Sequence, residues 1–260
     1  MAANKDSVTR TLLVALILCL VCAVVVSTAA VQLRPKQQAN QVLDRQVNIL
    51  RAAGMYEPGM DVQAEFEKME RRFVELSTGE YVDMPASYDQ RAASRDPEQS
   101  IRLDGETDIA SIRRQAKVAE VYLSRDDSGD LTSIILPVHG YGLWSTLYGF
   151  LSLEPDAETV KGLVFYEHAE TPGLGGEVDN PRWRGIWEGK QLFDEQGNVT
   201  IQVIKGSVDG STPDAEHKVD GLSGATLTSK GVSNLVRFWV GENGFGPYLE
   251  RVRRGDAAQN

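Results

Sequence analysis

The stretch from Thr11 to Leu33 constrains this chain more than any other feature, because its 23 residues carry no charge. At about 1.5 Å per residue, a helix of that length is about 34 Å long and crosses the hydrocarbon core of a bilayer. No comparable stretch follows, so the sequence predicts a single-pass protein with a polar head at 1–10. Small residues at 27–30 also fit a cleaved signal peptide. We favour an uncleaved anchor, because the apolar run exceeds the about 7–15 residues usual for such a peptide.

The charges beside this stretch do not decide which side of the membrane the larger part occupies. Two basic residues, Lys5 and Arg10, precede the stretch, and more basic residues follow it between 34 and 51. Counted alone, these charges place the larger part in the cytoplasm. Long acidic domains are exported largely regardless of flanking charge, however, so the orientation stays open at this point.

Both cysteines of the chain, Cys19 and Cys22, lie in the apolar stretch. Their i, i+3 spacing puts them on one helix face, where they either meet a partner helix or a metal centre or serve as small apolar residues. The remaining residues contain no thiol, so they give no indication of the redox compartment.

The overall charge excludes one class of partner. The chain has 27 Lys and Arg against 37 Asp and Glu, a formal net charge of −10. This balance leaves no basic face large enough to hold nucleic acid through its phosphates. The hydrophobic and charged fractions, 42% and 25%, are those of an ordinary globular protein.

Hydrophobic periodicity predicts two helices directly after the apolar stretch. Residues 38–53 form an amphipathic pattern that Gly54 ends, and residues 61–76 form a second one that Asp61 can cap. The segment 77–116 is polar and is predicted to be a connection rather than core.

The rest of the chain alternates between strand-like and helix-like patterns. Short β-rich runs cover 118–124, 131–140, 148–154, 160–168 and 199–207, and helical patterns cover 175–190 and 228–241. We therefore expect an α+β domain with helices packed on a largely antiparallel sheet. The expected divisions are a tail at 1–10, a transmembrane helix at 11–33, a helical and connecting region at 34–116 and the main domain at 117–260.

The common catalytic and nucleotide-binding motifs do not occur. His139, His168 and His217 stand far apart in sequence and lack the spacing of a metal site. The glycine-rich run at 173–176 has neither dinucleotide-fingerprint nor P-loop spacing, so binding of NADH or ATP by those routes is not expected.

The small, hydroxyl-rich segment at 220–229, DGLSGATLTS, is the most informative stretch. It can be a turn and helix cap, with Thr226 or Thr228 accepting hydrogen bonds from the first helical amides. It also approximates a nucleophile elbow around Ser223. That hypothesis fails because such a hydrolase needs a histidine after the serine, and His217 precedes it.

A third interpretation comes from resemblance. The motif D-G-L-S-G-A-T at 220–226 resembles a covalent flavin attachment sequence, and E-T-P-G-L-G at 170–175 resembles a second signature of the same domain. Together they resemble the covalent FMN-binding domain family found in the C subunits of the Na+-translocating NADH:quinone oxidoreductases. The apolar stretch, the early helices and the chain length agree with that family.

The resemblance implies that FMN is attached through a phosphoester to Thr226, with Thr228 as the alternative acceptor. A flavin transferase would recognise Asp220 and Ser223 during maturation. A helix starting near Thr228 would present free amides to the phosphate. The other residues that the resemblance places around the cofactor are Gly224, Ala225, Glu170, Thr171, Gly173, Leu174 and Gly175. Tyr141 and Trp144 either flank the flavin or belong to the core.

The resemblance also implies a role and an address. The chain would be an electron-carrying subunit of a six-subunit, sodium-pumping complex in the bacterial inner membrane, with its large domain on the periplasmic side. Electrons would arrive from an iron–sulfur centre in neighbouring membrane subunits and leave for a second covalent FMN subunit. NADH oxidation and quinone reduction would occur on other subunits. Two alternatives stay open: the homologous flavin subunit of the ferredoxin-linked electron-transport complex, and a non-redox membrane-anchored scaffold.

Overall fold

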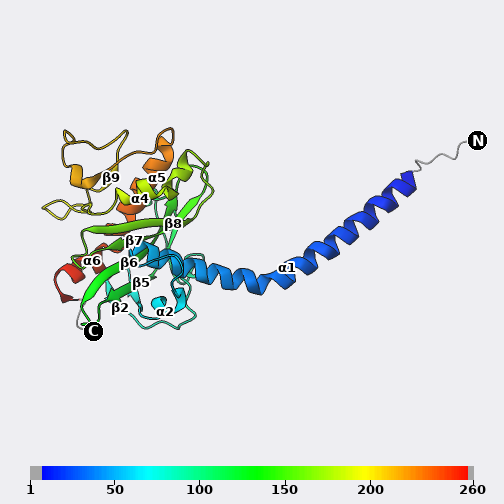
Figure 1. The fold of residues 1–260 in the computed structure, drawn as a ribbon, viewed down its shortest axis with the longest axis horizontal. Helices are drawn as coiled ribbons and strands as arrows, with labels where there is room; N and C mark the ends of the chain where they lie inside the picture. The colour runs from blue at the N-terminus through cyan, green and yellow to red at the C-terminus, as the bar shows by residue number, and fades with distance from the viewer. Residues whose placement is uncertain (1–7, 257–260) are drawn as a thin grey trace, which may run out of the picture. The chain divides into compact units, whose positions relative to one another are not determined.

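The computed structural model of the chain describes residues 8–256 (Figure 1). The chain divides into two compact units, one before Arg45 and one from Arg45 onward. The strands of the described residues all belong to the second unit, and the first is the greater part of a single helix.

That helix, α1, runs from Val8 to Ala52. The sequence predicts an apolar span and a separate amphipathic helix, whereas the structure joins them into one helix of 45 residues that includes Pro35. A proline removes only one hydrogen bond from a helix interior, and good helix formers on both sides maintain the turns. An exposed window of 18 residues with mean hydropathy 3.0 makes α1 long and apolar enough to cross a membrane. Cys19 and Cys22 lie exposed on it.

The second unit is built on a six-stranded sheet in the order β2-β1-β5-β6-β7-β8. Every neighbouring pair in it is antiparallel, as the sequence predicts. The strands are Glu80–Tyr81 (β2), Glu70–Glu75 (β1), Val118–Arg125 (β5), Leu131–Tyr141 (β6), Thr146–Leu153 (β7) and Val160–Glu167 (β8). The four β-rich runs predicted between 118 and 168 are therefore confirmed.

Apolar side chains cover both faces of this sheet. Along β6, Ile134 and Leu136 join the larger core, whereas Ile135 between them joins the smaller one. The larger core includes side chains from α5 (Thr226–Val240), α6 (Gly246–Arg253) and the short helix α4 (Pro181–Gly185). The smaller core includes Ile49 and Leu50 from the last turns of α1.

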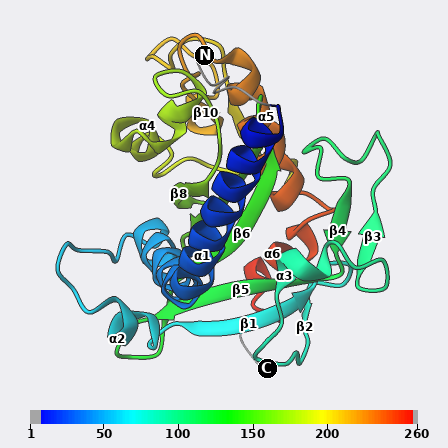
Figure 2. The ribbon, with the colours of Figure 1, turned by 90° about the vertical axis from the view of Figure 1, so that its right-hand side faces the viewer.

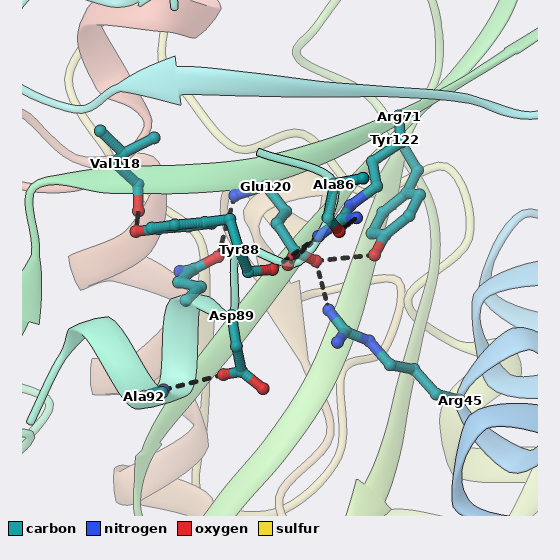
Figure 3. Close-up of polar contacts among 10 residues, drawn as sticks. Arg45, Arg71, Ala86, Tyr88, Asp89, Ala92, Val118, Glu120 and Tyr122 are labelled. Carbon is teal, nitrogen blue, oxygen red and sulfur yellow. Dashed lines mark hydrogen bonds and ion pairs between the residues drawn. The ribbon is translucent and has the colours of Figure 1, made fainter. Parts of the chain in front are cut away.

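A buried carboxylate also fixes the end of α1 to the sheet (Figure 3). The Glu120 side chain on β5 is fully buried and accepts hydrogen bonds from the Arg45 guanidinium, from Arg71 at 2.7 Å and from the Tyr122 hydroxyl at 2.7 Å. A buried carboxylate is tolerated only when it is paired in this way. The residues of α1 from Arg45 onward are thus held on the sheet by an ion pair and by apolar packing.

The structure corrects the helix predicted over 61–76. Asp61 does cap a helix, accepting from the Ala64 N–H at 3.1 Å, but that helix, α2, covers only Val62–Phe66. The chain then becomes strand β1, which pairs along its whole length with β5. Tertiary pairing overrides the local helical spacing of the apolar residues here.

Two other segments are more irregular than predicted. The expected helix at 175–190 is a 3₁₀ turn at Gly175–Asp179 (η1) followed by the five residues of α4. The expected strand at 199–207 contains only β9 (Gln202–Val203), which pairs in parallel with β10 (Lys218–Val219) after the short 3₁₀ turn η2 (Ala215–His217).

The polar segment before β5 forms a small excursion of its own (Figure 2). It contains helix α3 (Gln90–Ala93) and the antiparallel pair of β3 (Ser100–Arg102) and β4 (Arg114–Ala116).

Candidate functional site

Three segments that are distant in sequence meet at the Glu170 carboxylate. The backbone N–H groups of Leu143, Trp144 and Ser145, in the turn between β6 and β7, donate to Oε1 at 3.1, 2.9 and 3.2 Å. The Thr228 hydroxyl on α5 donates to Oε2 at 2.6 Å. Glu170 thereby connects the loop after β8, the β6–β7 turn and the first turn of α5.

Glu170 is charged in this setting. Its burial by itself raises the pKa of the carboxyl, but the hydrogen bonds from Thr228 and from the three backbone amides outweigh burial and lower that pKa below its usual range. The group is 4% exposed, so its charge is satisfied by protein donors rather than by bulk water.

Two glycines leave space for this carboxylate. A Cβ at Gly142 would lie 2.7 Å from Glu170 Oε1, and one at Gly175 would lie 2.5 Å from Thr228 Oγ1. Side chains at either position would collide with the hydrogen-bonded pair. The second glycine of the 170–175 motif is therefore required by the packing around Glu170.

The remaining motif residues of this loop shape the turn. The Thr171 carbonyl accepts from the N–H groups of Leu174 and Gly176, at 3.1 and 2.9 Å. Gly173 has a φ of +74°, in the left-handed region that glycine adopts without strain. The turn leaves the Leu174 side chain 43% exposed.

Helix α5 begins at Thr226, two residues earlier than predicted. Its N-cap is Ala225, with no side-chain cap, so the prediction that Thr226 or Thr228 caps the helix is wrong. The Thr228 hydroxyl is used by Glu170 instead. Thr226 is exposed whereas Thr228 is fully buried, so only Thr226 presents a hydroxyl that an external enzyme can reach.

The loop at 220–225, before α5, is held by hydrogen bonds to a second loop at 204–208. Asp220 Oδ1 accepts from the Val208 N–H at 2.7 Å, and the Gly221 N–H donates to the Gly206 carbonyl at 2.8 Å. Trp183 Nε1 donates to the Asp220 carbonyl at 2.8 Å. These contacts hold the exposed Ser223 and Gly224 next to the start of α5.

The segments that meet at Glu170 also carry exposed apolar side chains, which we call the apolar rim. It consists of four side chains, each between 43% and 65% exposed: Tyr141, Trp144, Leu174 and Leu227. A Cβ on Gly224 would lie 2.9 Å from Leu174 Cδ2, so this leucine lies directly against the loop 220–225 before α5. In the described residues beyond α1, only Ile101 and Ile109 are other large apolar side chains with such exposure. Tyr141 and Trp144 are thus surface residues, and their alternative assignment to the core is wrong.

Thr226, the loop 220–225 and α5 line a hollow of about 610 Å³. Its cationic lining residues are Lys205, Lys230 and Arg237. The site therefore offers a reachable hydroxyl, exposed apolar side chains and a basic hollow that Thr226 itself lines. This arrangement suits a cofactor with an apolar ring and an anionic end.

Sequence reasoning missed several residues of this site, among them Leu227, Gly142 and the three basic residues of the hollow, Lys205, Lys230 and Arg237. Leu227 follows Thr226 directly, and its apolar character in a polar segment was a usable signal. Lys205 and Gly142 carry no such signal, because their place at the site depends on loop contacts with residues far along the chain.

Comparisons with known proteins agree with this geometry. A family model described as FMN-binding domain matches residues 142–241. The chain is 53% identical over 261 residues to the C subunit of the Na(+)-translocating NADH-quinone reductase of Pseudomonas aeruginosa, covering 98% of this chain and 100% of that protein. The corresponding protein of Yersinia pestis is 51% identical over 257 residues, covering 97% and 96%.

Solved structures are similar to the chain as well. The crystal structure of Shewanella oneidensis NqrC has a TM-score of 0.75 at 38% identity, covering 81% of this chain and 97% of that chain. The crystal structure of the C subunit of the Na(+)-translocating NADH-quinone reductase from Parabacteroides distasonis has a TM-score of 0.65 at 27% identity, covering 84% and 96%.

Proposed function

This chain belongs to the family formed by the C subunits of the Na(+)-translocating NADH-quinone reductases, and we propose that it relays electrons through FMN joined to Thr226 by a phosphoester. The observation that carries the proposal is the different state of the two threonines of the motif. Thr226 is exposed at the uncapped start of α5, whereas Thr228 is buried and bonded to Glu170.

The residues around Thr226 fit this cofactor. Trp144, Tyr141, Leu174 and Leu227 offer exposed apolar surface for the ring system. Gly224 and Ala225 keep bulk away from the hydroxyl. The first amides of α5 lack a side-chain cap, so they can donate to a phosphate.

Bound there, FMN would supply the electron-transfer chemistry, and the protein would set its position and its surroundings. Glu170 is a positioning residue in this proposal. Its charge holds Thr228 and the β6–β7 turn, so that the first turn of α5 and the apolar rim keep their relative places. No residue of this chain needs to act as a base or nucleophile during electron transfer.

The apolar helix and the family suggest that the chain is membrane-anchored. We propose that 1–10 are a cytoplasmic tail, that 11–33 cross the bacterial inner membrane, and that 34–116 connect to a flavin domain at 117–260 on the periplasmic side. The proposed partners are the membrane iron–sulfur subunits as electron donor, the second covalent FMN subunit as acceptor, and a flavin transferase during maturation.

Mass spectrometry of the full chain tests the attachment. The protein is produced with a flavin transferase as wild type, Thr226→Val, Thr228→Val and Thr228→Ser. We expect one FMN mass on the peptide spanning 220–230 in wild type and in Thr228→Ser, which keeps a hydroxyl for Glu170. Thr226→Val should lack this mass.

Two results would contradict the proposal. FMN retained in Thr226→Val and lost in Thr228→Val would move the acceptor to residue 228. Absence of any flavin mass from the wild type, with a transferase shown to be active on another substrate protein, would favour the scaffold hypothesis.

A further inference from the structure

The hollow beside Thr226 is a local positive region on an acidic protein. The chain carries a formal net charge of −10, yet Lys205, Lys230 and Arg237 line this hollow and no carboxylate of the described residues does. Its other polar lining groups are hydroxyls, amides and backbone. A concave surface with this lining favours an anionic ligand.

The loop that carries Lys205 is held against the loop 220–225 before α5. The Ile204 N–H donates to the Val219 carbonyl at 2.9 Å, and the Gly221 N–H donates to the Gly206 carbonyl at 2.8 Å. A Cβ on Gly221 would lie only 2.3 Å from the Ile204 carbonyl oxygen. The backbones on both sides of Lys205 are thus fixed along the segment that leads to Thr226.

Lys230 reaches the same place from the helix. It lies four residues after Thr226 on α5, so both residues share one face of the helix and both line the hollow. Arg237 lies eleven residues after Thr226, about 16 Å along the axis at about 1.5 Å per residue. Its backbone is therefore too distant for it to share a single small anion at Thr226 with the two lysines.

We propose that Lys205 and Lys230, which line the same hollow as Thr226, form the phosphate subsite of this protein. This inference rests on the proposed function. A phosphoester on Thr226 would carry a negative charge, and the two ammonium groups would neutralise it. Leu174, which lies against Gly224, and the rest of the apolar rim would remain available to the ring. Both lysines are positioning residues that orient the cofactor through its phosphate.

Lysine reactivity tests the subsite in the full chain. Protein produced with and without the transferase is treated briefly with acetic anhydride. Peptide mass spectrometry then measures the rate of acetylation at Lys205 and Lys230. Lys68, whose side chain is 66% exposed, serves as the control. We expect severalfold slower acetylation of Lys205 and Lys230 in the flavin-bearing protein, and equal rates at Lys68. Equal rates at all three lysines, with FMN present on 220–230, would refute the subsite and leave the proposed function intact. Absence of FMN from that peptide would overturn the proposed function itself.

A second measurement separates phosphate binding from simple coverage by the ring. In the full-length Thr226→Val background, fluorescence titrations compare free FMN with riboflavin, which lacks the phosphate. We expect Lys205→Gln and Lys230→Gln each to weaken FMN binding about fivefold and to leave riboflavin binding unchanged. Lys68→Gln should change neither. Equal weakening of both ligands, or no preference of the parent protein for FMN, would refute the phosphate subsite. If neither ligand binds measurably, the acetylation rates decide.

Discussion

Replacing Glu170 by glutamine should destabilise the domain by about 2–4 kcal/mol. In the wild type, three backbone N–H groups and the Thr228 hydroxyl donate to this buried carboxylate. Hydrogen bonds to a charged group contribute about 1.5–3 kcal/mol each, against about 0.5–1.5 kcal/mol for neutral pairs. Glutamine keeps one acceptor oxygen, but its NH₂ group must face a donor. The expected loss is therefore larger than that of one neutral bond and smaller than the sum of four charged ones.

Urea denaturation of the full chain in detergent, followed by circular dichroism, measures this loss for Glu170→Gln. The matched control is Glu188→Gln, an exposed position where the change should stay within about 0.5 kcal/mol. The pH dependence supplies an independent check. Because hydrogen bonds lower the pKa of Glu170 in the folded state, its contribution is present above the unfolded value of 4.5 and is lost as pH falls through the lower folded value.

The stability gap between wild type and Glu170→Gln should therefore narrow as the solution becomes more acidic than pH 4.5. A gap at neutral pH below about 0.5 kcal/mol, or a gap that widens on acidification, would refute the assignment of Glu170 as the charged centre of the site.

Three further predictions test other features of the fold. Glu120→Gln removes the charge that forms ion pairs with Arg45 and Arg71, and it should lower the free energy of unfolding in urea by about 3–5 kcal/mol. A change below about 1 kcal/mol would contradict the buried ion pair. Gly175→Ala places a Cβ against Thr228 Oγ1 and should lower the free energy of unfolding by about 1–3 kcal/mol. Gly173→Ala meets open space but has a positive φ, so it should lower that free energy by about 1 kcal/mol. The reverse order in thermal melts would argue against the packing around Glu170. Burial, with a smaller effect of the Arg91 charge, lowers the pKa of His139 to about 4, so the folded state resists protonation of this group. His139 should therefore reduce the free energy of unfolding as pH falls from 6.5 towards 4. The same pH dependence of stability in wild type and His139→Gln would contradict this.

Local sequence patterns predict the parts of this fold that depend on neighbours along the chain. The apolar run of α1, the strands between 118 and 167 and the helix around Val232 and Leu235 all have strong periodicity, and the structure contains them. Strand β1 was missed because its identity depends on pairing with β5, which begins at Val118. The continuation of α1 through Pro35 was missed because a proline normally marks a break.

The site shows the same division. The two motifs indicate Thr226 and Glu170 as candidates, but the bond between Glu170 and Thr228 joins residues 58 positions apart, and the contact with Trp144 joins residues 26 apart. No local pattern predicts such contacts. Lys205 enters the site only because its loop is hydrogen-bonded to the segment before α5, and the sequence of neither segment indicates this contact.

The hydrogen bonds at the start of α5 have a consequence for chemical selectivity. Three hydroxyls lie within four residues there, at Thr226, Thr228 and Ser229. The Thr228 hydroxyl donates a hydrogen bond to Glu170, and Ser229 Oγ accepts one from the Leu222 N–H at 2.9 Å. Both side chains are also buried, so folding acts on them as protecting groups act in organic synthesis. A reagent or enzyme that approaches the first turn of α5 meets only the Thr226 alcohol there, so the fold itself selects which hydroxyl of this turn can be modified.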